Sequence, residues 1–427
     1  MRVKSSCRGG PGGGPGSGLL WIALALLLHA SPGGPFAAGP APPAARATVT
    51  DDRVREIQRR AVVVDTHADT LWRVLDKGDD ITVRSAKGQV DIPRLLEGGV
   101  DGQFFSIWPQ PLYGPSGYIK RCLRLIDALH GIIDRSGGKM FLATSADDIR
   151  RADHEGKIAA LLGIEGGHAI EDDLGALRMF HRMGVRYMTL TWSINTSWAD
   201  SSGDRRAYHG LTSFGGQVVH EMNRLGMIVD VSHVSDETFN DVLRVTSSPV
   251  IASHSSCRAL CDAPRNMTDD MLRALGKNGG VVMINFFPAF IDQDFRRASA
   301  AAEDGAKARI SAIASETLDD PVARENRTWE LHQSLDGSIP PPSIDLVLDH
   351  IEHAIQVAGV DHVGLGSDFD GITSAPRGLE DVSKLPALTR GLLERGHSED
   401  DVMKVLGGNF LRVFDRVAQI AMESARR

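Results

Sequence analysis

The most constraining feature of this sequence is the regular alternation of short apolar runs with helical stretches from residue 61 onward. The runs are rich in valine, isoleucine and leucine, with little polar alternation. This pattern is typical of parallel β-strands that are buried on both faces. Eight such runs occur, at residues 61–69, 102–108, 158–168, 186–192, 226–233, 249–255, 280–287 and 362–371.

Helical patterns lie between several of these runs, at residues 117–135, 174–184, 214–225 and 343–358. Eight strands that alternate with helices predict an α/β fold, a (β/α)8 TIM-like barrel. A doubly wound parallel sheet is the alternative, but it would normally carry a glycine-rich phosphate loop after the first strand, and none is present. The net charge of -8 argues against a nucleic-acid-binding surface, which would be basic.

The first 47 residues are not expected to belong to the fold. Basic residues precede the apolar run 19–30, which is shorter than the ~20 residues that a membrane span needs. A Gly/Pro/Ala-rich stretch follows. We therefore predict a signal peptide and leader at 1–47, and hence an exported protein, secreted or periplasmic. An uncleaved signal anchor is the alternative and the one route to the membrane that we expect, since the C-terminus shows no GPI signal.

Residues 48–427 are predicted to form a single catalytic domain. One segment, 288–342, interrupts the alternation between the seventh run and its helix. It is polar, rich in alanine, and ends in three prolines. A connection of this length is usually functional or disordered. In a barrel it would lie at the C-terminal face, so we expect it to cover the mouth of the site or to build a subunit contact.

Residues that can bind metals or transfer protons follow five of the eight runs. The carboxyl ends of barrel strands are where such enzymes keep their active sites. His67 and Asp69 are two residues apart, so their side chains point the same way in an extended strand. The complete set is His67, Asp69, Glu165, His233, His254 and Asp368.

This combination of histidines and carboxylates suits zinc or a similar divalent ion. Each residue alone could be a hydrogen-bonded polar group at a strand end, but together they predict a metal site. A single catalytic zinc needs only three protein ligands, so two ions that share a carboxylate fit the set better.

The chain resembles the membrane dipeptidase (renal dipeptidase) family of zinc metallopeptidases over roughly residues 55–420. That family is similar to the metal-dependent amidohydrolases in its barrel fold. The motifs and their order carry the resemblance: VVDTHADTLW (63–72), LLGIEGGH (161–168), LTWSINTSWAD (190–200), IVDVSHVS (228–235), VIASHSSCRALCDAPRNMTDD (250–270) and GLGSDFDG (364–371).

The resemblance implies hydrolysis of dipeptides at two Zn²⁺ ions per chain, which activate a bridging water. His67 and Asp69 would bind the first ion, His233 and His254 the second, and Glu165 both. Asp368 would be the catalytic acid/base. Arg265 would bind the substrate's C-terminal carboxylate, and bidentate recognition of that kind suits arginine.

One departure from the family pattern concerns substrate binding. Mammalian members have a histidine after the fourth strand that reaches the substrate, whereas this chain has Trp192. We expect Trp192 to reshape the substrate pocket, unless it packs away from it.

Two alternatives for the function stay open. One is a related amidohydrolase-type deacylase that acts on N-acyl amino acids. The other is a catalytically decayed family member that acts as a binding protein. The expected partners are small dipeptide substrates and no nucleic acid, and a homodimer is one option for the oligomeric state.

Overall fold

The computed structural model describes residues 48–426. The predicted signal peptide and leader lie outside the described residues and remain a prediction. None of the described helices is long and apolar enough to cross a membrane.

Within the described residues, the strands form one parallel sheet with the order β2-β1-β9-β8-β7-β6-β5-β4-β3, in which β2 also pairs with β4. That last pairing closes eight strands into a barrel and confirms the predicted (β/α)8 fold. The sequence did not predict β3, which lies outside the ring and pairs only with β4. The strands are β1 (Val64–Ala68), β2 (Gly102–Ile107), β3 (Met140–Leu142), β4 (Ile158–Glu165), β5 (Val185–Thr189), β6 (Ile228–Asp230), β7 (Ile251–Ser255), β8 (Val281–Ile284) and β9 (Val363–Leu365).

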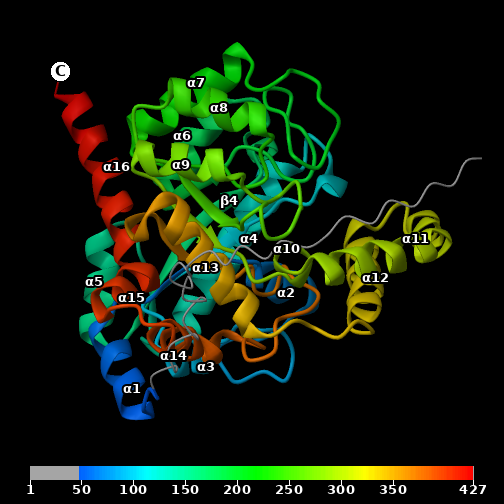
Figure 1. The fold of residues 1–427 in the computed structure, drawn as a ribbon. Coiled ribbons are helices and arrows are strands. Elements are labelled where there is room, and N and C mark those ends of the chain that lie inside the picture. Colours follow the sequence, from blue (N-terminus) through cyan, green and yellow to red (C-terminus); the bar gives the residue numbers. More distant parts are fainter. Residues whose placement is uncertain (1–47, 427) are drawn as a thin grey trace, which may run out of the picture. The chain divides into compact units, whose positions relative to one another are not determined.

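Helices surround the barrel (Figure 1). Many begin at a side-chain cap: the Thr212, Ser235 and Thr268 hydroxyls each accept a backbone N–H of the first turn. The helices are α1 (Asp51–Arg60), α2 (Thr70–Lys77), α3 (Ile92–Glu97), α4 (Tyr118–Arg135), α5 (Ala146–Glu155), α6 (Leu174–Arg182), α7 (Ser213–Leu225), α8 (Asp236–Val245), α9 (Asp269–Asn278), α10 (Pro288–Ile291), α11 (Gln293–Glu316), α12 (Pro321–Asp336), α13 (Ile344–Ala358), α14 (Pro386–Glu394), α15 (Glu399–Met403) and α16 (Asn409–Ala425).

The segment 288–342, which interrupts the alternation in the sequence, folds as α10, α11 and α12. In Figure 1, α11 and α12 project from one side of the barrel, while α16 lies on the opposite side. The long connection is therefore helical, as its many alanines allow.

A buried cluster fills the barrel and includes Val64, Phe104, Leu161, Tyr187 and Ile251. Strand β4 shows how the packing directs the site. Ala159 and Leu161 belong to this cluster, so the alternation of a strand also turns Glu165 inward, at the carboxyl end. Gly163 leaves the space that the Tyr187 ring occupies, and any side chain there would collide with that ring.

Two other strands depart from strict alternation where they carry candidate ligands. The pairing register of β1 shifts between Asp65 and Ala68, and that of β7 shifts between Ala252 and Ser255. Val64 and Ile251 face the barrel interior, so strict alternation would turn His67 and His254 away from it. The irregularities let both histidines join the site.

Candidate metal centre and substrate cavity

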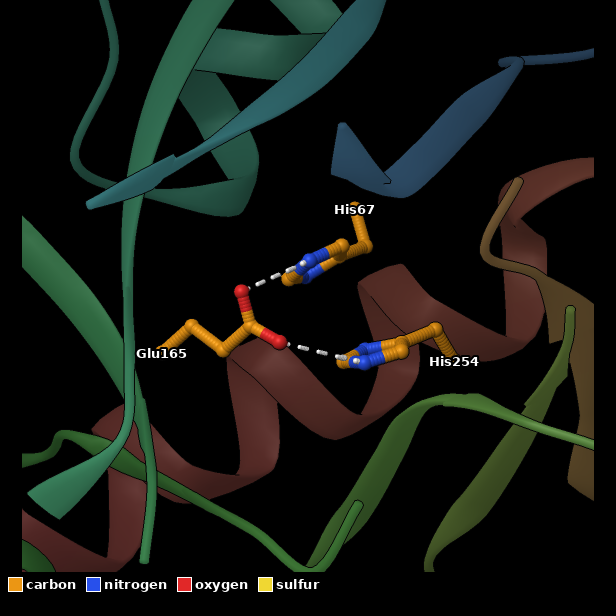
Figure 2. Close-up of side chains that lie close together, drawn as sticks. All are labelled: His67, Glu165 and His254. Atoms are coloured by element: carbon orange, nitrogen blue, oxygen red, sulfur yellow. Dashed lines mark ion pairs between the residues drawn. The ribbon is translucent and has the colours of Figure 1, made fainter. Parts of the chain in front are cut away.

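The carboxylate of Glu165 lies between three histidine rings. Its Oε2 atom is 3.5 Å from His67 Nε2, and its Oε1 atom is 2.9 Å from His233 Nε2 and 3.6 Å from His254 Nε2. Figure 2 shows the two oxygens turned toward different histidines, His67 on one side and His254 on the other. Glu165 is therefore placed to be shared between two cations.

The remaining candidate ligands lie on either side of Glu165. Asp69 Oδ2 is 3.5 Å from His67 Nε2, and the Nε2 atoms of His233 and His254 are 2.9 Å apart. Two groups of side chains have ligand atoms within 4.8 Å of one another: His67 with Glu165 and His254, and His67 with Asp69 and Asp368. The structure thus brings all six predicted residues together, and Asp368 belongs to the His67 side.

The buried histidine nitrogens and the Glu165 carboxylate of this cluster indicate a cation-binding site. His67 Nε2 is buried without a hydrogen-bond partner among the described residues. Burial lowers the pKa of His254 well below its usual value and that of His233 to about 4, so both rings are neutral donors of the kind that metals bind. Burial acts to raise the pKa of Glu165, but the three histidines hold it well below its usual value, so this carboxylate is ionised. The set fits divalent metal ions.

Neighbouring side chains orient the histidines. His254 Nδ1 is 2.7 Å from Ser253 Oγ, and this hydroxyl donates to Asp230 Oδ2 at 2.6 Å. Because the hydroxyl proton is used there, His254 Nδ1 donates and His254 Nε2 keeps its lone pair. Ligand-orienting contacts of this kind fix the tautomer of a metal-binding histidine.

The backbone is unusual at two of the site residues. His233 and Asp368 both have left-handed conformations, with φ of 67° and 63°. Such conformations are costly for residues other than glycine and concentrate at functional sites. Beside them, Gly371 must lack a side chain, because a Cβ there would collide with the Asp69 and Asp368 carboxylates.

Asp368 has the surroundings of a proton carrier. Asn285 Nδ2 donates to its Oδ2 at 2.8 Å, which leaves Oδ1 for a proton. Burial raises the pKa of Asp368 to about 7, and Asp69 and Glu165 add to the increase. A carboxyl group with a pKa near neutrality can both accept and donate a proton.

Arg265 and Trp192 line a cavity of about 740 Å³ together with Asp69, Glu165 and Asp368. Arg265 Nη2 donates to the carbonyl of His254 at 3.2 Å, while Nη1 is buried without a partner among the described residues. Burial lowers the pKa of Arg265 to about 10, so the group is still cationic at neutral pH. A buried guanidinium with free donors suits an anionic group of a ligand.

The Trp192 ring forms part of the cavity wall. Its centroid is 5.0 Å from that of Trp108 and 6.4 Å from that of His233. Trp192 therefore lies at the pocket, and its effect on the choice of substrate stays a prediction. His168 of the LLGIEGGH motif belongs to neither group of candidate ligands. Its Nε2 lies 2.8 Å from the carbonyl oxygen of Pro109.

Several functional neighbours were not predicted from the sequence: Ser106, Tyr187, Asp230, Ser253 and Asn285. The signal for two of them is visible in retrospect. Asp230 follows three apolar residues in its run, and Asn285 is the single polar residue of an otherwise apolar run; a buried polar side chain in such a run needs a partner.

Comparisons with known proteins agree with this geometry. Residues 51–427 match the family model described as membrane dipeptidase, peptidase family M19. The chain is 37% identical over 347 residues to dipeptidase aclJ from Aspergillus oryzae, which covers 79% of this chain and 72% of that protein.

Two solved structures are also similar. The probable dipeptidase PvdM from Pseudomonas aeruginosa has a TM-score of 0.74 at 27% identity and covers 86% of this chain and 98% of its own. A metallopeptidase from Rhodobacter sphaeroides, liganded with a phosphinate mimic of the dipeptide L-Ala-D-Ala, has a TM-score of 0.69 at 27% identity and covers 84% of this chain and 99% of its own.

Proposed function

Because the chain belongs to the membrane dipeptidase family, we propose that it is a zinc-dependent dipeptidase with two metal ions in its active site. The observation that carries the proposal is the carboxylate of Glu165, whose two oxygens face different histidines. His67 and Asp69 would hold one ion, His233 and His254 the other, and Glu165 would contact both. When bound, the ions supply an activated water nucleophile and polarise the scissile carbonyl.

The protein's own side chains bind the substrate and transfer the proton. Arg265 holds the carboxylate at the C-terminus of the substrate, with Nη1, which has no partner within residues 48–426, as a donor. Asp368 accepts a proton at Oδ1 and delivers it to the amine that leaves, while Asn285 keeps the other oxygen in place. Trp192 forms part of the wall of the cavity in which the substrate binds.

The relative from Rhodobacter sphaeroides, which is liganded with a mimic of L-Ala-D-Ala, supports dipeptides with a C-terminal D-residue as substrates. The carboxylate clamp also predicts which compounds are rejected. A dipeptide amide lacks the charge that Arg265 binds, and losing a charge-assisted hydrogen bond typically costs about 1.5–3 kcal/mol. We expect dipeptides to be hydrolysed at least tenfold faster than their amides.

The test is metal analysis of the purified protein combined with a substrate panel. About two zinc ions per chain and turnover of dipeptides are expected, with Arg265→Ala losing the preference over amides. One ion per chain would contradict the shared carboxylate. Faster cleavage of N-acyl amino acids would favour the deacylase, and bound zinc without turnover would favour a binding protein.

A further inference from the structure

Helix α12 presents one face to the substrate cavity. Glu325, Thr328, Trp329 and His332 all line it, and their spacing of three and four residues puts them on the same side of the helix. The helix belongs to the segment 288–342, outside the eight strands and their helices. The inserted segment therefore supplies part of the substrate-binding surface.

Glu325 has no ionic partner on this face. Its side chain is partly buried, and it makes no hydrogen bond or ion pair within residues 48–426. Burial raises the pKa of Glu325 to about 7, with a further increase from Asp76 and an opposing effect of Arg121. A carboxylate in these surroundings is stabilised by any cation that the cavity admits.

Two cations lower the pKa of Glu325, Arg121 and Lys77, and neither forms an ion pair with it. Arg121 donates to Asp76 Oδ1 at 2.7 Å and to Gln110 Oε1 at 3.0 Å, and it is fully buried in these contacts. Lys77 Nζ lies 4.7 Å from the centroid of the Trp72 ring. Arg296 and Arg324 also line the cavity, and within residues 48–426 no cation forms an ion pair with Glu325. A cationic group of the ligand can therefore pair with this carboxylate.

Aromatic rings also line the cavity. Trp72 and Trp329 meet edge to face, with centroids 5.3 Å apart, and both line the cavity, as do Trp108 and Trp192. Tryptophan faces attract ammonium and guanidinium groups. They also cover the aliphatic part of a long cationic side chain, as the Trp72 ring does for Lys77.

The ends of the cavity give the substrate a direction. Arg265 contacts the carbonyl of His254 and fixes the C-terminal carboxylate on that side. Helix α12 lies toward the other ion position, because Trp329, one turn after Glu325, contacts Trp72 of α2, the helix that begins next to Asp69. A dipeptide held by Arg265 therefore extends its N-terminal residue toward α12.

We propose that Glu325 binds a cationic side chain on the N-terminal residue of the substrate, so that the enzyme prefers dipeptides that begin with lysine or arginine. This inference rests on the proposed dipeptidase function. It assigns the inserted helix α12 the role of selecting among dipeptides.

The test compares two substrates, Lys-Ala and norleucine-Ala, on the zinc-loaded enzyme. Norleucine has the aliphatic chain of lysine without the ammonium group. The wild-type enzyme is expected to favour Lys-Ala in kcat/KM by roughly tenfold. Glu325→Gln, which keeps the size of the side chain, should bring the ratio close to 1. Glu330→Gln is the matched control, since Glu330 is an exposed carboxylate on the same helix, and it should keep the wild-type ratio.

Several outcomes would overturn the inference. One is a wild-type enzyme that does not distinguish the two substrates. Another is a Glu325→Gln variant that loses rate on both alike, which would assign Glu325 to the α-ammonium group or to the fold. Failure of the wild-type enzyme to hydrolyse either dipeptide would instead contradict the proposed function itself.

Discussion

The hydroxyl oxygen of Tyr187 lies 2.9 Å from Nδ1 of His67, at the centre of the barrel mouth. The same hydroxyl donates its single proton to the carbonyl of Thr66 at 3.0 Å. It can therefore only accept from His67, so Nδ1 of the ring carries a proton. Nε2 faces Asp69 and Glu165. Burial acts to lower the pKa of His67, but Tyr187 and the two carboxylates raise it well above its usual value, so a metal ion would displace a proton from Nε2. Tyr187 thus prepares His67 to bind a metal ion.

Replacing Tyr187 by phenylalanine tests this role. The variant removes one oxygen and keeps the ring that packs beside Gly163. Loss of such an orienting contact typically lowers metal affinity by about 10–100-fold. Zinc retention during dialysis against a chelator measures the effect. Tyr118→Phe is the control, because the Tyr118 hydroxyl donates to the carbonyl of Pro111 and to none of the candidate ligands among the described residues. Equal zinc retention in wild type and Tyr187→Phe would show that the hydroxyl does not orient the ring.

The barrel could be predicted from the sequence because its signal is repeated. The strand runs are apolar on both faces, and in the helices apolar residues recur every three to four positions. Because this signal is repeated along the chain, one misread element does not change the predicted fold. Strand β3 was missed for a physical reason. It is three residues long, lies outside the ring and follows a long helix, and these properties leave no distinct pattern.

The candidate ligands that the structure brings together could be predicted from the sequence, and the residues that orient them less so. His67 and His254 follow strand runs, but the register shifts that turn them inward leave no trace in residue type. Tyr187 illustrates the same limit. In the sequence it is an aromatic residue in an apolar strand, and only the closed barrel brings its hydroxyl across to His67.

Asp368→Asn should retain both metal ions and lose turnover. The amide preserves the shape of the side chain and cannot accept or deliver the proton at Oδ1. General acid–base catalysis contributes about 10²–10⁴-fold, and we expect a loss of kcat in that range. Metal analysis is measured beside the rate, since Asp368 lies within the ligand group of His67 and Asp69. A variant that loses an ion would make Asp368 a ligand and the acid/base assignment wrong.

Trp192→His should change the ranking of dipeptide substrates and leave the zinc content intact. The indole packs against Trp108 and lines the cavity, but Trp192 is absent from both ligand groups. A histidine there removes apolar surface and adds a hydrogen-bond acceptor. Values of kcat/KM over a panel of N-terminal residues measure the ranking. An unchanged ranking in a stably folded variant would mean that the indole only packs against its neighbours.

Asp101 makes the stability of the barrel depend on pH. Its carboxylate accepts the backbone N–H of Val63 at 2.8 Å, and burial raises its pKa to about 7. Since the unfolded value is about 3.9, the folded protein holds this proton more tightly. The stability that the proton contributes is complete below pH ~4 and is lost as the pH rises through about 7.

Asp101→Asn keeps an acceptor for Val63 and removes the charge. Urea unfolding should therefore show the variant gaining about 1–3 kcal/mol over wild type between pH 4.5 and pH 8. The exposed control Asp147→Asn should show no such gain, and a pH-independent difference for Asp101→Asn would mean that the carboxyl group is already ionised in the folded protein at pH 4.5.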